Sequence, residues 1–432
     1  MVDLNFSIME DWAGWLLVLF SFSIVLMWKH VRSDTKVVHA IWFCIVLHHA
    51  VAFLNAYVGN VLGAKGDNGT AHTISVELAA LPEPEWIYGT GLVIYTQFVG
   101  LFYRAFGASL LLGEELSILA FALSCVVLVK LVNLLDMRRF RVGIVLLFGL
   151  LPSAVIFRSL TFRESWQALF FLLAVYWAVR LRKRGGILIV SFLLMSGFCL
   201  SLLHWSLSYY AMYLIAISVY WGIFCRKKGV QFLFTGLLVA CVIILVQKMG
   251  WFMTVEQAFE DAKYFRQRAI DFVDARAVYG VMLDTSSVLG FVTTTPMVFV
   301  QYMFAPFPWQ VENVKDICAM LESMLRFVLL FFAVFSWRRS SSEVRSYYSF
   351  LLIAVLAMEF VWALGTVNWG TAARHHVLGY SVIVLLGGPG LIQFMWKLHL
   401  KLHFWISGRR KVSISQDREI FVKSDPKINE ML

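Results

Sequence analysis

Long apolar runs separated by short polar segments recur along the whole chain. The runs long enough to cross about 30 Å of hydrocarbon are Trp12–Trp28, Val37–Val58, Leu116–Leu135, Val142–Phe157, Ser165–Val179, Ile187–Leu203, Leu207–Cys225, Gln231–Val246, Cys318–Trp337, Tyr347–Leu364 and Val377–Trp396. This pattern predicts about eleven transmembrane helices. We therefore expect an all-α, polytopic integral membrane protein.

The composition supports this fold class. Of the 432 residues 60% are hydrophobic and 15% are charged, and the mean hydropathy of +0.75 lies far above the range of soluble globular chains. The six cysteines stand singly, without a CxxC pair or a Cys/His ligand spacing, so neither a disulfide framework nor a zinc site is predicted. The first run follows an acidic start, "MVDLNFSIMED", and no cleavable signal peptide is expected.

Basic residues fall on alternate loops between the predicted spans. The segments are "KHVRSDTK", "DMRRFR", "RLRKRGG", "CRKKG", "WRRSSSEVR" and "KLHLKLHFWISGRRK". The positive-inside rule assigns all of them to the cytoplasm, with the N-terminus outside and the C-terminus inside. One missed span would invert every later loop, so the agreement supports the topology. We expect a membrane domain over residues 1–407 and a cytoplasmic polar tail over 408–432.

Two long segments, about 59–114 and 250–315, lie on the opposite side of the predicted membrane. Within them "GTGLVIYTQFVGLFYRAFG" and "GFVTTTPMVFVQYMFAPFPWQ" are apolar but interrupted by Gly, Pro and polar residues. They are predicted to be interfacial or re-entrant, which is tolerated only where protein or a water-filled cavity covers the irregular backbone. We therefore expect a cavity that opens to the outer face.

Arginines on these outward loops have no topological use and need another explanation. Any one of them can be an ordinary helix-end residue or a salt-bridge partner, as Arg163 is with Glu164. Several guanidinium groups around one pocket form a good receptor for a diphosphate, because the planar fork binds phosphate bidentately and keeps its charge. The candidates for this role are Arg158, Arg163, Arg266, Arg268, Arg276 and Arg374. A lipid-linked sugar fits such a polyanion site at the membrane surface.

Sugar transfer from a lipid diphosphate requires an activated acceptor hydroxyl and cations that stabilise the departing phosphate. The candidate catalytic residues are Asp67, Glu164, His375 and His376. Adjacent residues on a helix diverge by about 100°, so both histidines are not expected to reach one atom. Glu164 can equally stabilise a helix start, and Asp67 can belong to a simple turn.

Aromatic residues on the outward loops are candidates for glycan binding. With His204 they are Trp205, Tyr279, Trp309 and Trp369. The alternative for each aromatic residue is an anchoring belt at the bilayer boundary.

Ionisable residues within the predicted spans are costly and therefore also indicate function. They are Lys130, Glu359 and the pair Glu322 and Arg326. The i,i+4 spacing of that pair predicts that the two side chains neutralise each other, as a structural pair rather than a proton path.

Four segments carry a resemblance to a known group. They are "GDNGTAH" in the first outward loop, the "PSAVIFRSLTFRES" turn, the Arg-rich part of the late loop before "FAPFPWQ", and "GTAARHH". With the architecture they resemble Wzy-type oligosaccharide repeat-unit polymerases and the related O-antigen ligases, which are bacterial enzymes of the GT-C glycosyltransferase superfamily. The resemblance implies periplasmic arginines that hold lipid pyrophosphates, and glycan transfer without a metal, nucleotide or other cofactor. It gives the pyrophosphate-holding role to Arg163, Arg266, Arg268, Arg276 and Arg374.

The chain departs from the ligases in their large-loop pattern, and from many GT-C monoglycosyltransferases in the paired acidic motif of the first loop. The acceptor and the general base therefore stay open.

The sequence thus predicts a membrane glycosyltransferase of the bacterial inner membrane, active in O-antigen or exopolysaccharide biosynthesis. It would transfer an undecaprenyl-pyrophosphate-linked glycan onto the non-reducing end of another lipid-linked repeat unit at the periplasmic face. The alternatives are a GT-C enzyme with a lipid-phosphate monosaccharide donor, an O-antigen ligase and, from another class, a flippase or transporter for the lipid-linked glycan. Transporters usually carry charge through the midplane and have related halves, whereas these basic residues gather on one face.

The expected partners are the lipid-linked oligosaccharide, membrane lipids, and polysaccharide assembly proteins such as a flippase or a chain-length regulator. Nucleic acid is not expected as a partner.

Overall fold

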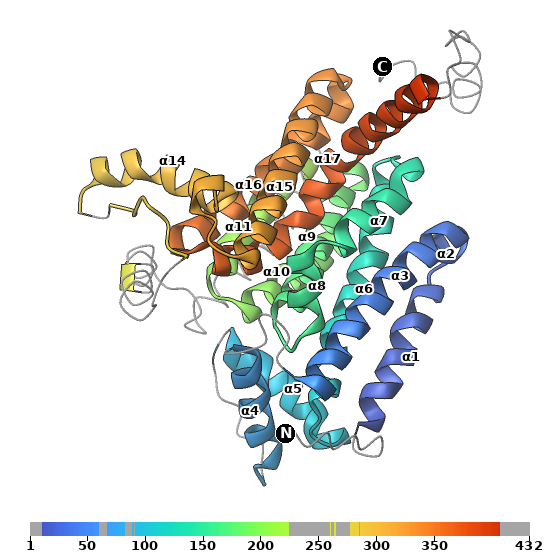
Figure 1. Cartoon of the computed structure of the whole chain (residues 1–432), viewed down its shortest axis with the longest axis vertical. Helices are drawn as coiled ribbons and strands as arrows, with labels where there is room; N and C mark the ends of the chain where they lie inside the picture. The colour runs from blue at the N-terminus through green and yellow to red at the C-terminus, as the bar shows by residue number, and fades with distance from the viewer. Residues whose placement is uncertain are drawn as a thin grey trace.

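The computed structural model describes residues 11–59, 67–82, 89, 91–223, 260, 263–264, 277–284 and 286–406. Its regular elements are helical, apart from an isolated bridge between Val278 and Asn368, and the predicted all-α class is confirmed. The helices (Figure 1) are α1 (Trp12–Leu26), α2 (Lys29–Arg32), α3 (Thr35–Phe53), η1 (Leu54–Val58), α4 (Asp67–Ala80), α5 (Leu92–Phe106), α6 (Leu110–Leu134), η2 (Arg138–Phe140), α7 (Arg141–Gly149), α8 (Pro152–Ser159), α9 (Glu164–Arg184), α10 (Ile187–Leu203), α11 (Ser206–Ile223), α14 (Val288–Phe304), η4 (Pro308–Gln310), α15 (Val314–Arg339), α16 (Ser342–Gly365) and α17 (Trp369–Ile406).

Five helical segments in this part of the chain are long and apolar enough to cross a membrane. They are α3 with η1, α6, α15, α16 and most of α17, and a sixth results if the bent pair α7–α8 is counted as one span. Helices α1, α5 and α10 and most of α14 are apolar but shorter. This set supports a polytopic membrane protein. The predicted span at Ser165–Val179 is helical as well, and so is Leu207–Cys225 as far as Ile223, where the described residues end. The predicted span Gln231–Val246 lies outside the described residues.

Two predicted boundaries differ from the structure. Helix α6 begins at Leu110, so Glu114 and Glu115, expected in the outer loop, are fully buried inside it. The run Val142–Phe157 is not one helix, because α7 and α8 meet at a bend of 69°. Pro152 starts α8 and has no N–H to continue the hydrogen bonding of α7, which explains the break.

The two predicted interfacial segments form α5 and α14. Helix α5 packs against α4, and both lie at one end of the bundle. Figure 1 shows α14 extending away from the upright helices, and its Leu289 and Val292 are 74% and 60% exposed. An exposed apolar helix that runs at a large angle to the bundle suits the interface of a membrane.

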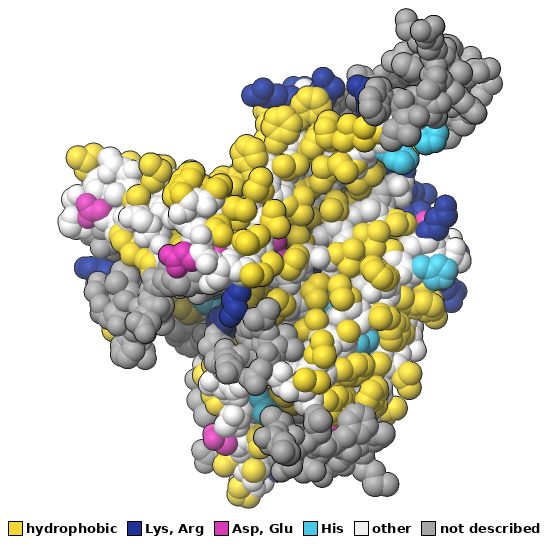
Figure 2. Space-filling model, viewed as in Figure 1, with side chains coloured by type: hydrophobic (Ala, Val, Ile, Leu, Met, Phe, Trp, Pro, Cys, Tyr) yellow, Lys and Arg dark blue, Asp and Glu magenta, His cyan; other side chains and the backbone are white. Residues whose placement is uncertain are grey.

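Basic loops gather at one end of the molecule. Arg141 forms an ion pair with Asp34 at 2.8 Å, Lys183 Nζ lies 3.5 Å from Asp136, and Arg182 Nη1 donates to the carbonyl of Ser346 at 3.0 Å. These contacts join four of the six basic segments. Figure 2 shows Lys and Arg side chains along the same upper end, above a surface that is largely apolar. The predicted grouping of these four loops therefore agrees with the fold.

Candidate functional site

Three of the segments that carry the family resemblance meet at the opposite end of the bundle, together with Ala277, which follows the Arg-rich part of the late loop. Asn68 in the first turn of α4 accepts from the amide of Thr161 at 2.8 Å. Glu164, at the start of α9, forms an ion pair with Arg374 of α17. The end of the late loop pairs with the start of α17, since the amide of Trp369 donates to the carbonyl of Ala277 at 3.2 Å. Segments far apart in sequence thus share one location.

At their centre lies a group that we call the arginine cluster, made of Arg163, Glu164, His204, Arg374 and His375. The Glu164 carboxylate is 2% exposed, and its Oε1 lies 3.0 Å from Arg374 Nε and 3.8 Å from Arg163 Nε. The two arginine side chains are 17% and 18% exposed. A buried carboxylate needs such cationic partners. Glu164 therefore orients two guanidinium groups, and the three side chains carry a formal charge of +1.

Gly91 makes room for Arg163. Its backbone has φ +70°, and a Cβ atom there would lie 2.7 Å from Arg163 Nη1. The Gly91 amide donates to the carbonyl of Leu202 at 2.8 Å, which fixes the start of α5 beside the end of α10. The glycine thus allows the first outward segment to approach the guanidinium closely.

His204, which follows α10, borders the cluster. Burial and the nearby Arg163 and Arg374 guanidinium groups hold the pKa of His204 well below its usual value. Its Nδ1 accepts from the amide of Ser206 at 3.3 Å, so the neutral ring carries its proton on Nε2. His204 is therefore a neutral hydrogen-bond donor beside two positive charges.

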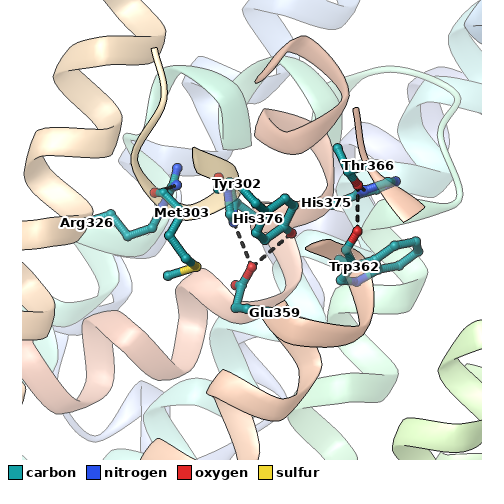
Figure 3. Close-up of polar contacts among 8 residues, drawn as sticks. All are labelled: Tyr302, Met303, Arg326, Glu359, Trp362, Thr366, His375 and His376. Atoms are coloured by element: carbon teal, nitrogen blue, oxygen red, sulfur yellow. Dashed lines mark hydrogen bonds and ion pairs between the residues drawn. The ribbon is translucent and has the colours of Figure 1, made fainter. Parts of the chain in front are cut away.

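His375 is oriented by Trp362 of α16 and by Thr366, the residue that follows this helix (Figure 3). Its ring stacks on Trp362 with centroids 3.9 Å apart, and its Nδ1 lies 2.9 Å from Thr366 Oγ1. The Thr366 hydroxyl donates to the Trp362 carbonyl at 2.7 Å, so it accepts from His375 Nδ1–H. The proton of neutral His375 is thereby on Nδ1, and Nε2 keeps a lone pair. Nε2 is therefore the nitrogen that could take up a proton from a substrate.

His376 points elsewhere, as the helical geometry predicts. It is 2% exposed, and its Nδ1 and Nε2 lie 2.7 Å from Glu359 Oε2 and 2.9 Å from the Tyr302 carbonyl. Both ring nitrogens are therefore engaged inside the bundle. The candidate catalytic residue His376 is consequently not part of the arginine cluster.

Arg158 is also directed inward. It is 1% exposed, its Nη2 donates to the Val377 carbonyl at 2.7 Å, and its guanidinium lies 3.9 Å from the Phe148 ring centre. Its Nη1 reaches the Phe148 carbonyl at the end of α7. Because Pro152 cannot donate to that carbonyl, Arg158 supports the broken helix instead of the cluster.

Four other predicted residues are not placed by side chain. Arg266, Arg268 and Arg276 lie outside the described residues. Asp67 is the first residue of α4, next to Asn68, and its side chain is likewise outside the described part.

The predicted glycan-binding residues disperse. His204 belongs to the cluster, and Trp205 follows it. Tyr279 and Trp369 are 2% and 6% exposed, and Trp369 Nε1 donates to Asp316 Oδ1 at 3.1 Å. Trp309 is 80% exposed and stacks on Phe307. Trp369 thus anchors the start of α17, whereas Trp309 lies on the surface.

The predicted Glu322–Arg326 pair does not form. The Ser153 amide donates to Glu322 Oε1 at 2.6 Å, and Arg326 Nη1 donates to the Met303 carbonyl. Helix ends in the apolar interior offer these backbone groups, which compete with the i,i+4 partner.

Sequence reasoning missed the residues that orient the histidines. Trp362 lies in the last turn of α16 and Thr366 directly follows the helix, and nothing in their local sequence indicates chemistry. It also missed the buried contact between His49 Nδ1 and Glu115 Oε1 at 2.9 Å, because Glu115 was expected in a loop. The doublet His48–His49 inside an apolar run was the available signal.

No family model, curated protein or solved structure matches the chain. Within the described residues, no group of three or more His, Cys, Asp or Glu side chains is placed to hold a metal ion.

Proposed function

We propose that the chain is a membrane glycosyltransferase that acts on polyprenyl-pyrophosphate-linked glycans, with the arginine cluster as its pyrophosphate site. The observation that carries the proposal is the meeting of Arg163, at the start of α9, and Arg374 of α17 at one buried carboxylate, with His375 next to Arg374 in the chain. The polymerase reaction predicted from the sequence is the form that we favour. In this reading the cluster end of the bundle faces the periplasm and the basic end faces the cytoplasm.

Helix starts add to the positive potential of this site. Helix α9 begins at Glu164, α11 begins at Ser206 next to His204, and α17 begins at Trp369, five residues before Arg374. The amino end of a helix carries a partial positive charge, which favours phosphate. Arg163 and Arg374 supply full charges and planar donors, and His204 Nε2–H supplies a neutral donor. A diphosphate matches this set better than a single carboxylate does.

The late loop adds a further link to the site. Ala277, which holds the amide of Trp369, directly follows Arg276 in the sequence. The predicted arginines of this loop are therefore connected to the start of α17 by a short stretch of chain. Arg276 itself lies outside the described residues, and its role in holding pyrophosphate stays a prediction from the sequence.

In the proposed reaction, the acceptor hydroxyl attacks the anomeric carbon of the donor glycan. His375 Nε2 takes the hydroxyl proton, a new glycosidic C–O bond forms, and the C–O bond to the diphosphate breaks. Polyprenyl pyrophosphate leaves with the electron pair of that bond, and Arg163 and Arg374 stabilise its added charge. Glu164 keeps both guanidinium groups in place. The ligase and the lipid-phosphate transferase would use the same cluster with another acceptor or donor.

Charge-neutral substitution tests the proposal. In cells that depend on this protein for polymer, we expect Arg163→Gln and Arg374→Gln each to lower polymer formation roughly 100-fold, the usual effect of removing one transition-state donor. His375→Gln should lower it by at least about 100-fold, because a general base is lost. Lipid-linked repeat units should still reach the outer leaflet. Arg104→Gln is the matched control, because Arg104 is an exposed arginine whose guanidinium donates to the Leu81 and Pro82 carbonyls.

Two outcomes would contradict the proposal. Full-length polymer in cells with Arg163→Gln and in cells with Arg374→Gln would show that the arginine cluster is not the pyrophosphate site. Repeat units that accumulate on the cytoplasmic leaflet of the same variants would favour the flippase.

A further inference from the structure

A second polar network lies inside the bundle, next to His375 of the arginine cluster (Figure 3). Glu359 of α16 is 0% exposed, and its Oε2 accepts from Tyr302 Oη at 3.0 Å and faces His376 Nδ1 at 2.7 Å. The Tyr302 side chain is also fully buried. Three helices, α14, α16 and α17, therefore meet at one carboxyl group.

The hydrogen bonds of this network fix its protons. The Tyr302 carbonyl can only accept, so His376 Nε2 carries a hydrogen. One further proton then lies between His376 Nδ1 and Glu359 Oε2. The pair is neutral overall whichever atom holds that proton, which makes its burial among apolar helices tolerable.

The network also completes the end of α14. The last turn of a helix leaves carbonyl groups without partners inside the helix. Tyr302 and Met303 contribute two of these carbonyls, and they accept from His376 Nε2 and from Arg326 Nη1. Donors from α17 and α15 thus hold the carboxyl end of α14 against the bundle.

Glu359 continues the row of α16 residues that orients His375. Glu359 and Trp362 are spaced i and i+3 and lie on one face of α16, and Thr366 follows the end of the helix one turn beyond Trp362. Trp362 and Thr366 contact His375. Glu359 contacts the next residue along α17, His376. Gly379 leaves space for this contact, because a Cβ atom there would lie 2.1 Å from Glu359 Oε1.

We infer that Glu359 and His376 are positioning residues, which fix the rotation of α17 against α16 and thereby direct Arg374 and His375 into the arginine cluster. An apolar pair at these positions would pack in several rotations, whereas directed hydrogen bonds allow one. The functional consequence rests on the proposed pyrophosphate site. The geometric part, a single register of α16 and α17, does not.

Substitution of Glu359 separates positioning from proton transfer. Glu359→Gln can place its amide NH2 where Oε2 lies and donate one N–H to His376 Nδ1 and the other to Tyr302 Oη, so the register should persist and polymer formation should stay within about twofold of the natural protein. Glu359→Leu keeps similar volume and removes the hydrogen bonds. We expect it to lower polymer formation at least roughly tenfold. The affinity for inorganic pyrophosphate, measured by the thermal shift that added pyrophosphate produces, should also fall at least roughly tenfold. A role in proton transfer would inactivate both variants equally and overturn the inference.

Glu115→Leu provides the matched control. It breaks the other buried His–Glu contact, between α3 and α6, and should reduce thermal stability without removing the response to pyrophosphate. Should Glu359→Leu fail to fold, Tyr302→Phe replaces it, because this change removes one hydrogen bond and little volume. A full response to pyrophosphate in Glu359→Leu or Tyr302→Phe would overturn the inference.

A second readout distinguishes failure of this inference from failure of the proposed function. If the natural protein shows no thermal shift with pyrophosphate and forms no polymer, the proposed function falls. The register is then judged by amide hydrogen exchange over residues 366–376. Exchange roughly tenfold faster in Glu359→Leu than in Glu115→Leu supports it, and equal exchange in the two variants overturns it.

Discussion

At the scale of single residues, His204 shows how the site sets a protonation state. Its pKa is held down first by burial and then by Arg163 and Arg374. Because the folded pKa lies below the ordinary value near 6.5, the unfolded chain takes up a proton first as the pH falls. The stability contributed by neutral His204 is therefore present above pH 6.5 or so and is lost as the pH drops from there towards the folded pKa.

Replacement by Gln, which cannot titrate, checks this prediction. His204→Gln should flatten the fall in the free energy of unfolding between about pH 6.5 and pH 5. The slope should change by at most about 1.4 kcal/mol per pH unit for one proton, and melting curves across this pH range measure it. Parallel curves for the natural protein and the variant would show that His204 is not kept neutral by its surroundings.

At the scale of elements, α17 depends on glycines for its contact with α15. A Cβ atom at Gly387 would lie 2.0 Å from the backbone oxygen of Leu329, whereas one at Gly388 would meet side chains at 3.4 Å or more. We expect Gly387→Ala to destabilise the protein by about 2 kcal/mol or more, because a backbone clash cannot be relieved by a rotamer change.

The neighbouring glycine supplies the control for this pair of helices. Gly388→Ala should leave the free energy of unfolding unchanged within about 1 kcal/mol. Alanine loses less backbone entropy than glycine when a helix forms, and this offsets the tighter contacts. Thermal melting in detergent measures both variants. Equal stability of the two would mean that α15 and α17 do not approach each other as closely as described.

At the scale of the whole molecule, the contacts define two opposite ends. Asp34, Asp136, Arg182 and Ser346 mark the basic end, and the arginine cluster marks the other. With the six native cysteines replaced, a membrane-impermeant maleimide should label Ser286→Cys in intact cells and Ser342→Cys only after permeabilisation. Both positions are exposed. Labelling of both from the same side would contradict a bundle whose two ends lie across a membrane.

Much of the architecture could be predicted from the sequence. Apolar runs such as Val37–Val58 and Cys318–Trp337 coincide with helices because hydropathy and helix length are local properties that tertiary contacts leave unchanged. The break between α7 and α8 was missed, although Pro152 stood in the run. The pattern of hydrophobic residues continues across the bend and conceals it.

The candidate site could be predicted in part. The sequence marks four polar residues on outward loops as candidates, because basic residues there do not serve the positive-inside rule. The structure brings these four together: Arg163, Glu164, His204 and Arg374. Arg158 had the same sequence signal and turns inward, because the carbonyl of Phe148 requires a donor. Local sequence does not record which backbone groups a distant bend leaves without partners.

The sequence by itself therefore determined the helical class, the apolar segments and the grouping of the basic loops, since each follows from the transfer of nearby residues between water and lipid. Tertiary structure alone decided which charged side chains meet. His375 and His376 are neighbours in the chain, yet one faces Trp362 and the other Glu359, because the packing of α17 against α16 sets the direction of each ring.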